Sequence, residues 1–362
     1  MTSDPELAIG GIECPESCEF QRVEMAARLP DGGIVVFDRG RREARFFDEE
    51  GRHLRSMGGQ GAGPGEFRQF DEVVIAPERL AVHDRGNGRI TVLSLDGELE
   101  RIHDVRDHPA FSGTAELVGL LGEDGAVVAQ RRHLQTPGTP GYTYVRDTVV
   151  VLEAALGGGR VDTLEVVPGN EGLRWSVAGP TGGTFTTVPL PFAHTVDFAS
   201  AQGRLVIARS DANGVHVIDI RGETRTILRD PDSSPRELAS DRRRSHIAER
   251  VAQAEARGEE DLATVRRDAE EQLDMIPSGH VVPVRDRVMT DSEGGVWMRE
   301  YEPPGSAIAR RWIVFSPQGE ARATVEVPEG FQIMHIGPEE VTGVVRDSLG
   351  VETVEIRRLD KQ

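Results

Sequence analysis

The stretch Ile34-Val-Val-Phe-Asp-Arg-Gly40 has a close copy in Leu80-Ala-Val-His-Asp-Arg-Gly86. Each copy leads into an alternating apolar pattern that ends in a tight glycine turn, at Arg45-Phe-Phe-Asp-Glu-Glu-Gly51 and at Ile90-Thr-Val-Leu-Ser-Leu-Asp-Gly97. The spacing from the first aspartate to the closing glycine is the same in both. Each unit therefore predicts a buried strand, a charged turn, a second strand, a glycine turn and a further strand.

Weaker copies of this unit continue along the chain and bring the total to six; they begin at Gly125, Leu205, Gly295 and Val341. Short strands at regular spacing with glycine turns are typical of a β-propeller. The 41 Gly and 21 Pro residues supply many turns without reaching the level of a low-complexity chain. We therefore predict an all-β fold, a six-bladed β-propeller, as a single domain over residues 1–362.

Two segments depart from the regular repeat. The sixth unit is one strand short, and we expect residues 7–12 or residues 20–26 to complete the last blade, because ring closure removes two exposed sheet edges. Residues 235–277 carry apolar side chains at three- and four-residue steps, which predicts a helical hairpin inserted between blades 4 and 5. This insertion is either a surface arm or a helix pair that binds a partner or covers the binding face.

The charge balance bears on possible partners. With 42 basic and 61 acidic residues, the net charge is -19, which argues against nucleic acid or an anionic membrane as the main partner. No apolar run approaches the roughly 18 residues of a membrane span. Cys14 and Cys18 form either a local disulfide or two free thiols, because no other cysteine exists to complete a metal site.

One motif carries a resemblance to a known family. Gly61-Ala-Gly-Pro-Gly-Glu-Phe67, together with Val36-Phe-Asp38 and Phe47-Asp-Glu-Glu-Gly51, resembles the bacterial six-bladed β-propeller family related to NHL-repeat proteins. The glycine-rich stretch lacks the lysine of a P-loop and is interpreted as a linker between blades. The resemblance implies an extracytoplasmic protein, periplasmic or on the cell surface. No signal peptide is visible in residues 1–6, so we expect either a cytoplasmic protein or a chain that begins after processing.

The strand that precedes each charged turn supplies the candidate site. We expect these strands to line the central channel and to place charged residues around one mouth: Asp38, Asp84, Arg131, Arg209, Glu300 and Arg346 or Asp347, with Arg39, Arg85, Arg132 and Arg299 beside them. Such a ring suits a small anionic or zwitterionic ligand, or a protein partner. The alternative is turn chemistry, in which the carboxylates cap backbone N–H groups and the arginines form exposed ion pairs.

Catalytic signals are weaker. No Gly-x-Ser-x-Gly elbow is present in the sequence. The candidate acid–base residues are His83, His194, His216 and His335. The alternative is that these histidines have ordinary packing or surface roles. Calcium-dependent propeller lactonases are similar in architecture, and Asp38, Asp84 and Glu300 offer the oxygen ligands that calcium prefers, but the adjacent arginines oppose a divalent ion. We predict a binding module without a cofactor. The alternative is a lactonase-like hydrolase or lyase at the channel mouth, with calcium as its one candidate cofactor.

Overall fold

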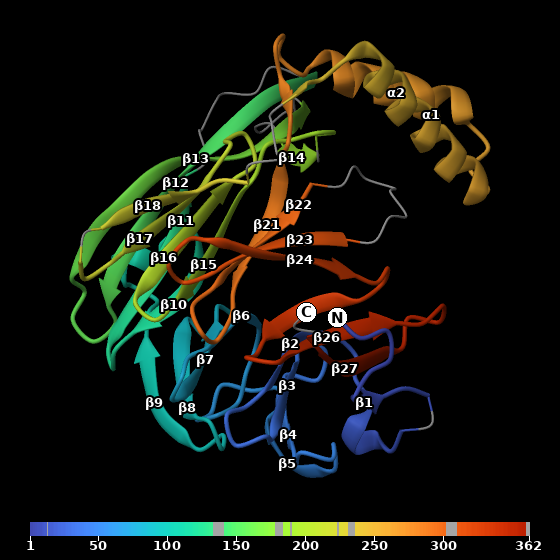
Figure 1. Ribbon diagram of the computed structural model, residues 1–362. Coiled ribbons are helices and arrows are strands. Elements are labelled where there is room, and N and C mark those ends of the chain that lie inside the picture. The colour runs from blue at the N-terminus through green and yellow to red at the C-terminus, as the bar shows by residue number, and fades with distance from the viewer. Residues whose placement is uncertain are drawn as a thin grey trace.

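Six antiparallel sheets of four or five strands stand around a common axis in the described part of the chain (Figure 1). The structure is a computed structural model, and it describes residues 1–12, 14–132, 141–177, 184–188, 190–222, 224–230, 236–301 and 310–359. Each sheet is one blade, with its strands hydrogen-bonded largely in chain order. The predicted all-β, six-bladed β-propeller is confirmed.

The strands divide among the blades as follows. Blade 1 contains β2 (Val23–Arg28), β3 (Ile34–Asp38), β4 (Glu43–Phe47) and β5 (His53–Gly58). Blade 2 contains β6 (Phe70–Ile75), β7 (Arg79–Asp84), β8 (Arg89–Ser94) and β9 (Leu99–Asp104). Blade 3 contains β10 (Thr114–Leu121), β11 (Gly125–Arg132), β12 (Gly141–Ala155), β13 (Val161–Val177) and β14 (Thr184–Val188). Blade 4 contains β15 (Val196–Ala201), β16 (Arg204–Arg209), β17 (Val215–Asp219) and β18 (Arg225–Leu228). Blade 5 contains β21 (Arg285–Thr290), β22 (Val296–Glu300), β23 (Arg310–Phe315) and β24 (Ala321–Val327).

Blade 6 joins the two ends of the chain. It contains β25 (Gln332–Ile336), β26 (Glu340–Arg346) and β27 (Glu352–Arg358), and β1 (Leu7–Gly10) pairs antiparallel with β27 as its outermost strand. The two termini therefore lie close together (Figure 1). Of the two segments expected to complete this blade, residues 7–12 contain β1, whereas residues 20–26 overlap β2, the first strand of blade 1.

A buried carboxylate also links the last blade to the first. Glu352, at the start of β27, is 2% exposed and accepts a 2.6 Å hydrogen bond from the backbone N–H of Val23 in β2. Its other oxygen accepts a 2.7 Å bond from Arg346 Nε. Because Val23 and Glu352 are at opposite ends of the sequence, this contact fixes blade 6 against blade 1.

The first strand of each blade is innermost. β2 contacts β6, β6 contacts β10, β10 contacts β15, β15 contacts β21, and β25 contacts β2. Hydrophobic clusters fill the space between neighbouring blades around the wheel. All five residues of β3 are buried, because both faces of that strand are covered, whereas the outermost strand β5 is mostly exposed. The predicted channel strands are therefore misplaced: the strands before the charged turns are second in their blades, one strand away from the axis.

The repeated glycine turns have a steric cause. Gly51 and Gly97, at equivalent turns of blades 1 and 2, have φ angles of +79° and +77°, a region that favours glycine. A Cβ atom on Gly97 would lie 2.4 Å from the Phe46 ring of blade 1. The turn of one blade therefore packs directly against its neighbour.

The departures from the wheel lie on one side of it. β12 and β13 are longer than the other strands of blade 3, and their projecting ends form what we call the blade 3 extension. The helices α1 (Ser240–Ala256) and α2 (Leu262–Asp274) project near this extension (Figure 1). β19 (Arg236–Glu237) and β20 (Val281–Val282) pair at the base of the helices. A cluster that includes Leu173, Phe192 and Leu273 joins them to β13. Residue 235, the expected start of the insertion, lies outside the described residues.

Two short helices and a disulfide complete the fold. The 3-10 helices are η1 (Glu16–Cys18) and η2 (Pro109–Phe111). Cys14 and Cys18 form a disulfide with a Cα–Cα distance of 5.8 Å. Within the described ranges, neither α-helix has the length and apolar character that a bilayer crossing requires.

Candidate functional site

The innermost strands carry an acidic residue near their first position in five of the six blades. These residues are Glu24, Asp71, Glu116, Asp197 and Asp286, and Gln332 takes the place in blade 6. All six strands begin at the same mouth of the channel, which we call the entrance. The carboxylates therefore gather where the channel opens.

β-Bulges determine the direction in which several of these side chains point. The strand register skips Glu24, Asp71 and Asp286, which are the extra residues between two paired neighbours. A bulge lets consecutive side chains point toward the same side of a sheet. In blade 2 this brings both Asp71 and Glu72 to the guanidinium of Arg85, at 3.3 Å and 3.4 Å.

Arginines at the ends of the second strands pair with these acids and connect neighbouring blades. Arg39 contacts Glu24 of its own blade at 3.3 Å and Asp71 of blade 2 at 2.7 Å. Arg85 Nη2 donates a 2.9 Å hydrogen bond to the carbonyl of Ala115 in blade 3. In blade 5, Arg299 Nε is 2.6 Å from Asp286. We call the five acids together with Glu72, Arg39, Arg85, Arg131, Arg287 and Arg299 the entrance ring.

The ring is less tightly paired in blades 3 and 4. Arg131 is 3.8 Å from Glu116, beyond hydrogen-bond range, and its buried Nη1 has no partner among the described residues. Burial raises the pKa of Glu116, and burial also raises the pKa of Asp197 although the Val288 N–H donates to it at 2.7 Å. Burial lowers the pKa of Arg287, which faces Asp197. Arg131 and Glu116 therefore lack the close pairing that the ring has in blades 1, 2 and 5.

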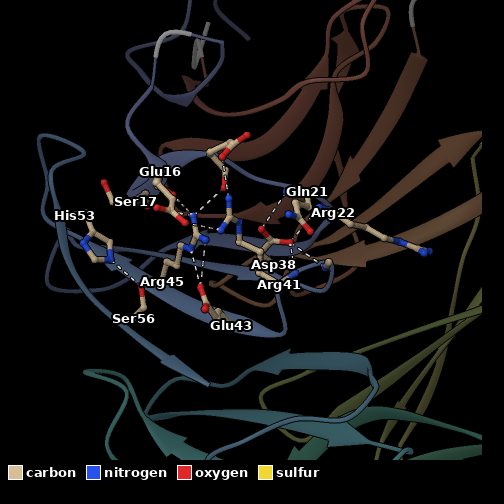
Figure 2. A network of polar contacts seen from close by, with 12 residues as sticks. Glu16, Ser17, Gln21, Arg22, Asp38, Arg41, Glu43, Arg45, His53 and Ser56 are labelled. Atoms are coloured by element: carbon tan, nitrogen blue, oxygen red, sulfur yellow. Dashed lines mark hydrogen bonds and ion pairs between the residues drawn. The ribbon is translucent and has the colours of Figure 1, made fainter. Parts of the chain in front are cut away.

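The expected acidic members of the mouth have a different role. Asp38 is fully buried, and its carboxylate accepts hydrogen bonds from the backbone N–H groups of Gln21, Arg22, Gly40 and Arg41 at 2.9–3.3 Å (Figure 2). Asp84 in blade 2 accepts from Arg68, Gln69 and Asn87 in the same way. For Asp38 and Asp84 the contacts match turn chemistry rather than a ligand mouth.

The other expected residues divide between the ring and local pairs. Arg131 and Arg299 belong to the ring. Arg209 binds Asp211 at 2.9 Å, Glu300 binds Arg311 at 2.8 Å, and Arg346 binds Glu352 at 2.6 Å. Because their strands are second from the axis, the expected residues do not form one circle around the channel. Among the candidate histidines, His83 is 4% exposed in its side chain and holds Glu72 at 2.5 Å through Nδ1.

A pocket opens beside the ring at the base of the blade 3 extension. It has a volume of about 260 Å³ and is lined by Arg131, Arg146, Asp147, Glu171, Arg174 and neighbouring residues. Arg146 and Arg209 both bind Asp211, and against the effect of burial they lower its pKa to about 2. Three arginines, Arg131, Arg146 and Arg174, therefore line this pocket.

A buried histidine cluster lies next to the pocket. Ligand atoms of Glu171, His194 and His280 lie within 4.8 Å of one another. His194 Nδ1 meets Glu171 at 2.9 Å, its Nε2 donates to the Val281 carbonyl at 2.9 Å, and its ring stacks on His280. Burial acts to raise the pKa of Glu171, but hydrogen bonds from His194 and Tyr144 lower it.

The donor set of this cluster bears on the calcium alternative. Two imidazoles and one carboxylate are unlike the oxygen ligands that calcium takes. The three expected calcium ligands, Asp38, Asp84 and Glu300, do not form such a group among the described residues. The hydrogen bonds of His194 instead connect the base of the helices to blade 3.

The sequence reasoning missed the acids of the innermost strands, although a signal for them exists. Val23-Glu24, Phe70-Asp71, Ala115-Glu116, Val196-Asp197, Arg285-Asp286 and Phe331-Gln332 repeat once in each blade. Aligning the units on this dipeptide, instead of on the Asp-Arg-Gly turn, selects the innermost strands.

The geometry defines a β-propeller with a charged channel entrance, and comparison with known proteins agrees with the propeller fold. The model of a family described as "6-bladed beta-propeller" matches residues 11–115. No curated protein matches the chain.

Two solved structures are similar to the chain over nearly its whole length. The crystal structure of a member of the duf4221 family from Bacteroides vulgatus is similar over 98% of both chains, with a TM-score of 0.53 and 11% identity. A putative exported protein from Bacteroides fragilis matches over 99% of this chain and 98% of its own, with a TM-score of 0.48 and 9% identity. The predicted resemblance to bacterial six-bladed propellers is confirmed at the level of the fold.

Proposed function

We propose that the chain is one propeller domain, with residues 235–277 as an insertion between blades 4 and 5, and that it binds a small organic anion at the entrance. The ligand carries a carboxylate or phosphate that meets Arg131 in the pocket between the ring and the blade 3 extension. The carrying observation is the buried Nη1 of Arg131, which has no hydrogen-bond partner among the described residues.

The electrostatics of the pocket support this assignment. Its lining holds three arginines against Asp147 and Glu171, and Glu171 already accepts from His194. Arg131 lies 3.8 Å from Glu116, the carboxyl whose pKa burial raises. A guanidinium presents paired N–H donors that match a carboxylate or phosphate. An anion at Arg131 therefore gains charge-assisted hydrogen bonds that the free protein lacks.

Calorimetric titration with phosphate, succinate and citrate tests the site. We expect at least one of the three to bind, and Arg131→Ala to weaken its binding by about 10- to 100-fold, because a hydrogen bond to a charged group contributes roughly 1.5–3 kcal/mol. Arg160→Ala is the matched control, since the Arg160 side chain is exposed and its guanidinium pairs with Asp162 at 2.8 Å. Binding of none of the anions, or equal affinity in Arg131→Ala, rejects the proposal.

A binding role, rather than catalysis, is part of the proposal. His83, the candidate base beside the entrance, is buried against Phe111 with a ring separation of 5.1 Å, which limits its access to a substrate. Turnover in a screen of lactones and esters, with and without calcium, that is lost in Glu72→Gln overturns this part.

We also propose that the protein works outside the cytoplasm. The disulfide between Cys14 and Cys18 supports an oxidising compartment, because such bonds rarely persist in the cytosol. Fractionation of the producing cells tests this: recovery in the periplasmic or surface fraction with blocked thiols is expected, and recovery as a cytosolic dithiol contradicts it.

A further inference from the structure

The mouth opposite the entrance contains a larger cavity. Its volume is about 320 Å³, and its lining comes from all six blades. Most of the lining residues lie at or just beyond the ends of the innermost strands, as Arg28 does in β2, Ile75 in β6 and Thr290 in β21. Arg28 is the fourth residue after Glu24 along β2, so this mouth lies roughly 13 Å from the entrance ring at ~3.3 Å per residue.

The walls of this cavity are mainly apolar, and include Leu29, Val74, Ile75, Leu95, Leu120 and Pro338. Apolar walls with a few convergent polar groups are typical of small-molecule sites. Several blades contribute at once, so the cavity exists only in the closed wheel. Such a site favours a ligand that gains free energy by leaving water.

The charged side chains of the lining already interact with other charged or polar groups of the protein. Asp291 accepts from the Gly295 N–H at 2.6 Å and from Trp297 Nε1 at 3.0 Å. Arg28 Nη1 pairs with Glu6 at 3.4 Å, although the buried Nε of Arg28 has no hydrogen-bond partner among the described residues. The charge of Glu340 helps to raise the pKa of Arg358. A charged ligand would lose its hydration here without gaining an unpaired countercharge. The cavity therefore favours an uncharged molecule.

His335 supplies the polar contact. Its Nδ1 is buried and has no hydrogen-bond partner among the described residues, and its ring lines the cavity. Burial lowers the pKa of His335 to about 4, so the ring is neutral at physiological pH. A neutral imidazole offers one donor and one acceptor nitrogen. A ligand with a hydroxyl, a carbonyl or an N–H group can satisfy one of them.

We propose that this second mouth binds an uncharged, largely apolar small molecule that hydrogen-bonds to His335. The site is independent of the anion site, because the two lie at opposite ends of the channel and share no residue.

The probe is N-phenyl-1-naphthylamine, an uncharged apolar fluorophore with one N–H group, excited directly and titrated with the full-length chain. We expect a saturable rise in fluorescence with one probe per chain. Ala201→Trp fills the cavity from blade 4 and should weaken binding by at least about tenfold, because the indole occupies the space of the ligand. His335→Leu should weaken binding by about fivefold through loss of one hydrogen bond.

The controls separate this site from general surface binding and from the anion site. Ala323→Trp, on the exposed outermost strand of blade 5, and Arg131→Ala should both leave the affinity unchanged. If Ala201→Trp fails to fold, Ala76→Trp fills the same cavity from blade 2. A fluorescence rise that does not saturate, or equal affinity in the folded cavity-filling variant, overturns the proposal.

Discussion

Asp38→Ala separates turn chemistry from a ligand mouth most directly. The carboxylate of Asp38 accepts four backbone hydrogen bonds, from Gln21 and Arg22 before β2 and from Gly40 and Arg41 after β3. Alanine leaves all four donors without this partner. Each unsatisfied buried donor costs about 1–3 kcal/mol, and the lower value suits these half-buried groups. The expected loss in the free energy of unfolding is therefore about 4 kcal/mol.

Urea unfolding monitored by circular dichroism measures this loss. Asp48→Ala is the matched control, because Asp48 caps a turn through the N–H groups of Glu50 and Arg52 but its side chain is partly exposed, whereas Asp38 is fully buried. We expect a smaller effect there, since water replaces the lost bonds. Anion binding by folded Asp38→Ala should equal that of the parent protein. An unchanged urea midpoint combined with weaker anion binding would refute the turn assignment and restore Asp38 to the site.

Two further predictions concern closure and pH. Glu352→Ala removes the buried acceptor of the Val23 N–H. We therefore expect the free energy of unfolding to fall by about 2–3 kcal/mol and the N-terminal segment to be cleaved faster by a protease. Glu355→Ala is the control and should have less effect, because it leaves the Glu352 acceptor in place. The pKa of His335 is about 6.5 in the unfolded state and about 4 in the folded state. The free energy of unfolding that depends on this group is therefore at its maximum above pH 6.5 and falls as the pH drops from 6.5 to 4. The total loss is up to about 3 kcal/mol. His335→Gln should flatten the corresponding part of the stability–pH curve, and an unchanged slope would contradict the burial of this ring.

The propeller fold can be predicted from the sequence because the same packing and turn constraints recur from blade to blade. Continuous apolar strands such as β3 occur where neighbouring blades cover both faces, and Gly51 and Gly97 recur where the turn demands positive φ. These are local constraints, and a single sequence displays them directly.

The entrance is harder to predict because its geometry depends on bulges. One extra residue in β2, β6 or β21 changes which side chain faces the axis, and simple alternation cannot anticipate that change. Asp38 and Asp84 repeat in the sequence and therefore suggest a common site. They repeat because each carboxylate accepts the backbone N–H groups of an equivalent turn. The pocket at Arg131 combines residues from β11, β12 and β13, which no spacing rule brings together.

The pairing of β1 with β27 also governs how the protein can be made. During synthesis β1 stays unpaired until β27 has left the ribosome, because Leu7 of β1 pairs with Ile356 of β27. A prematurely terminated product keeps two open sheet edges and is prone to associate with other chains. Closure of the wheel therefore requires synthesis through β27.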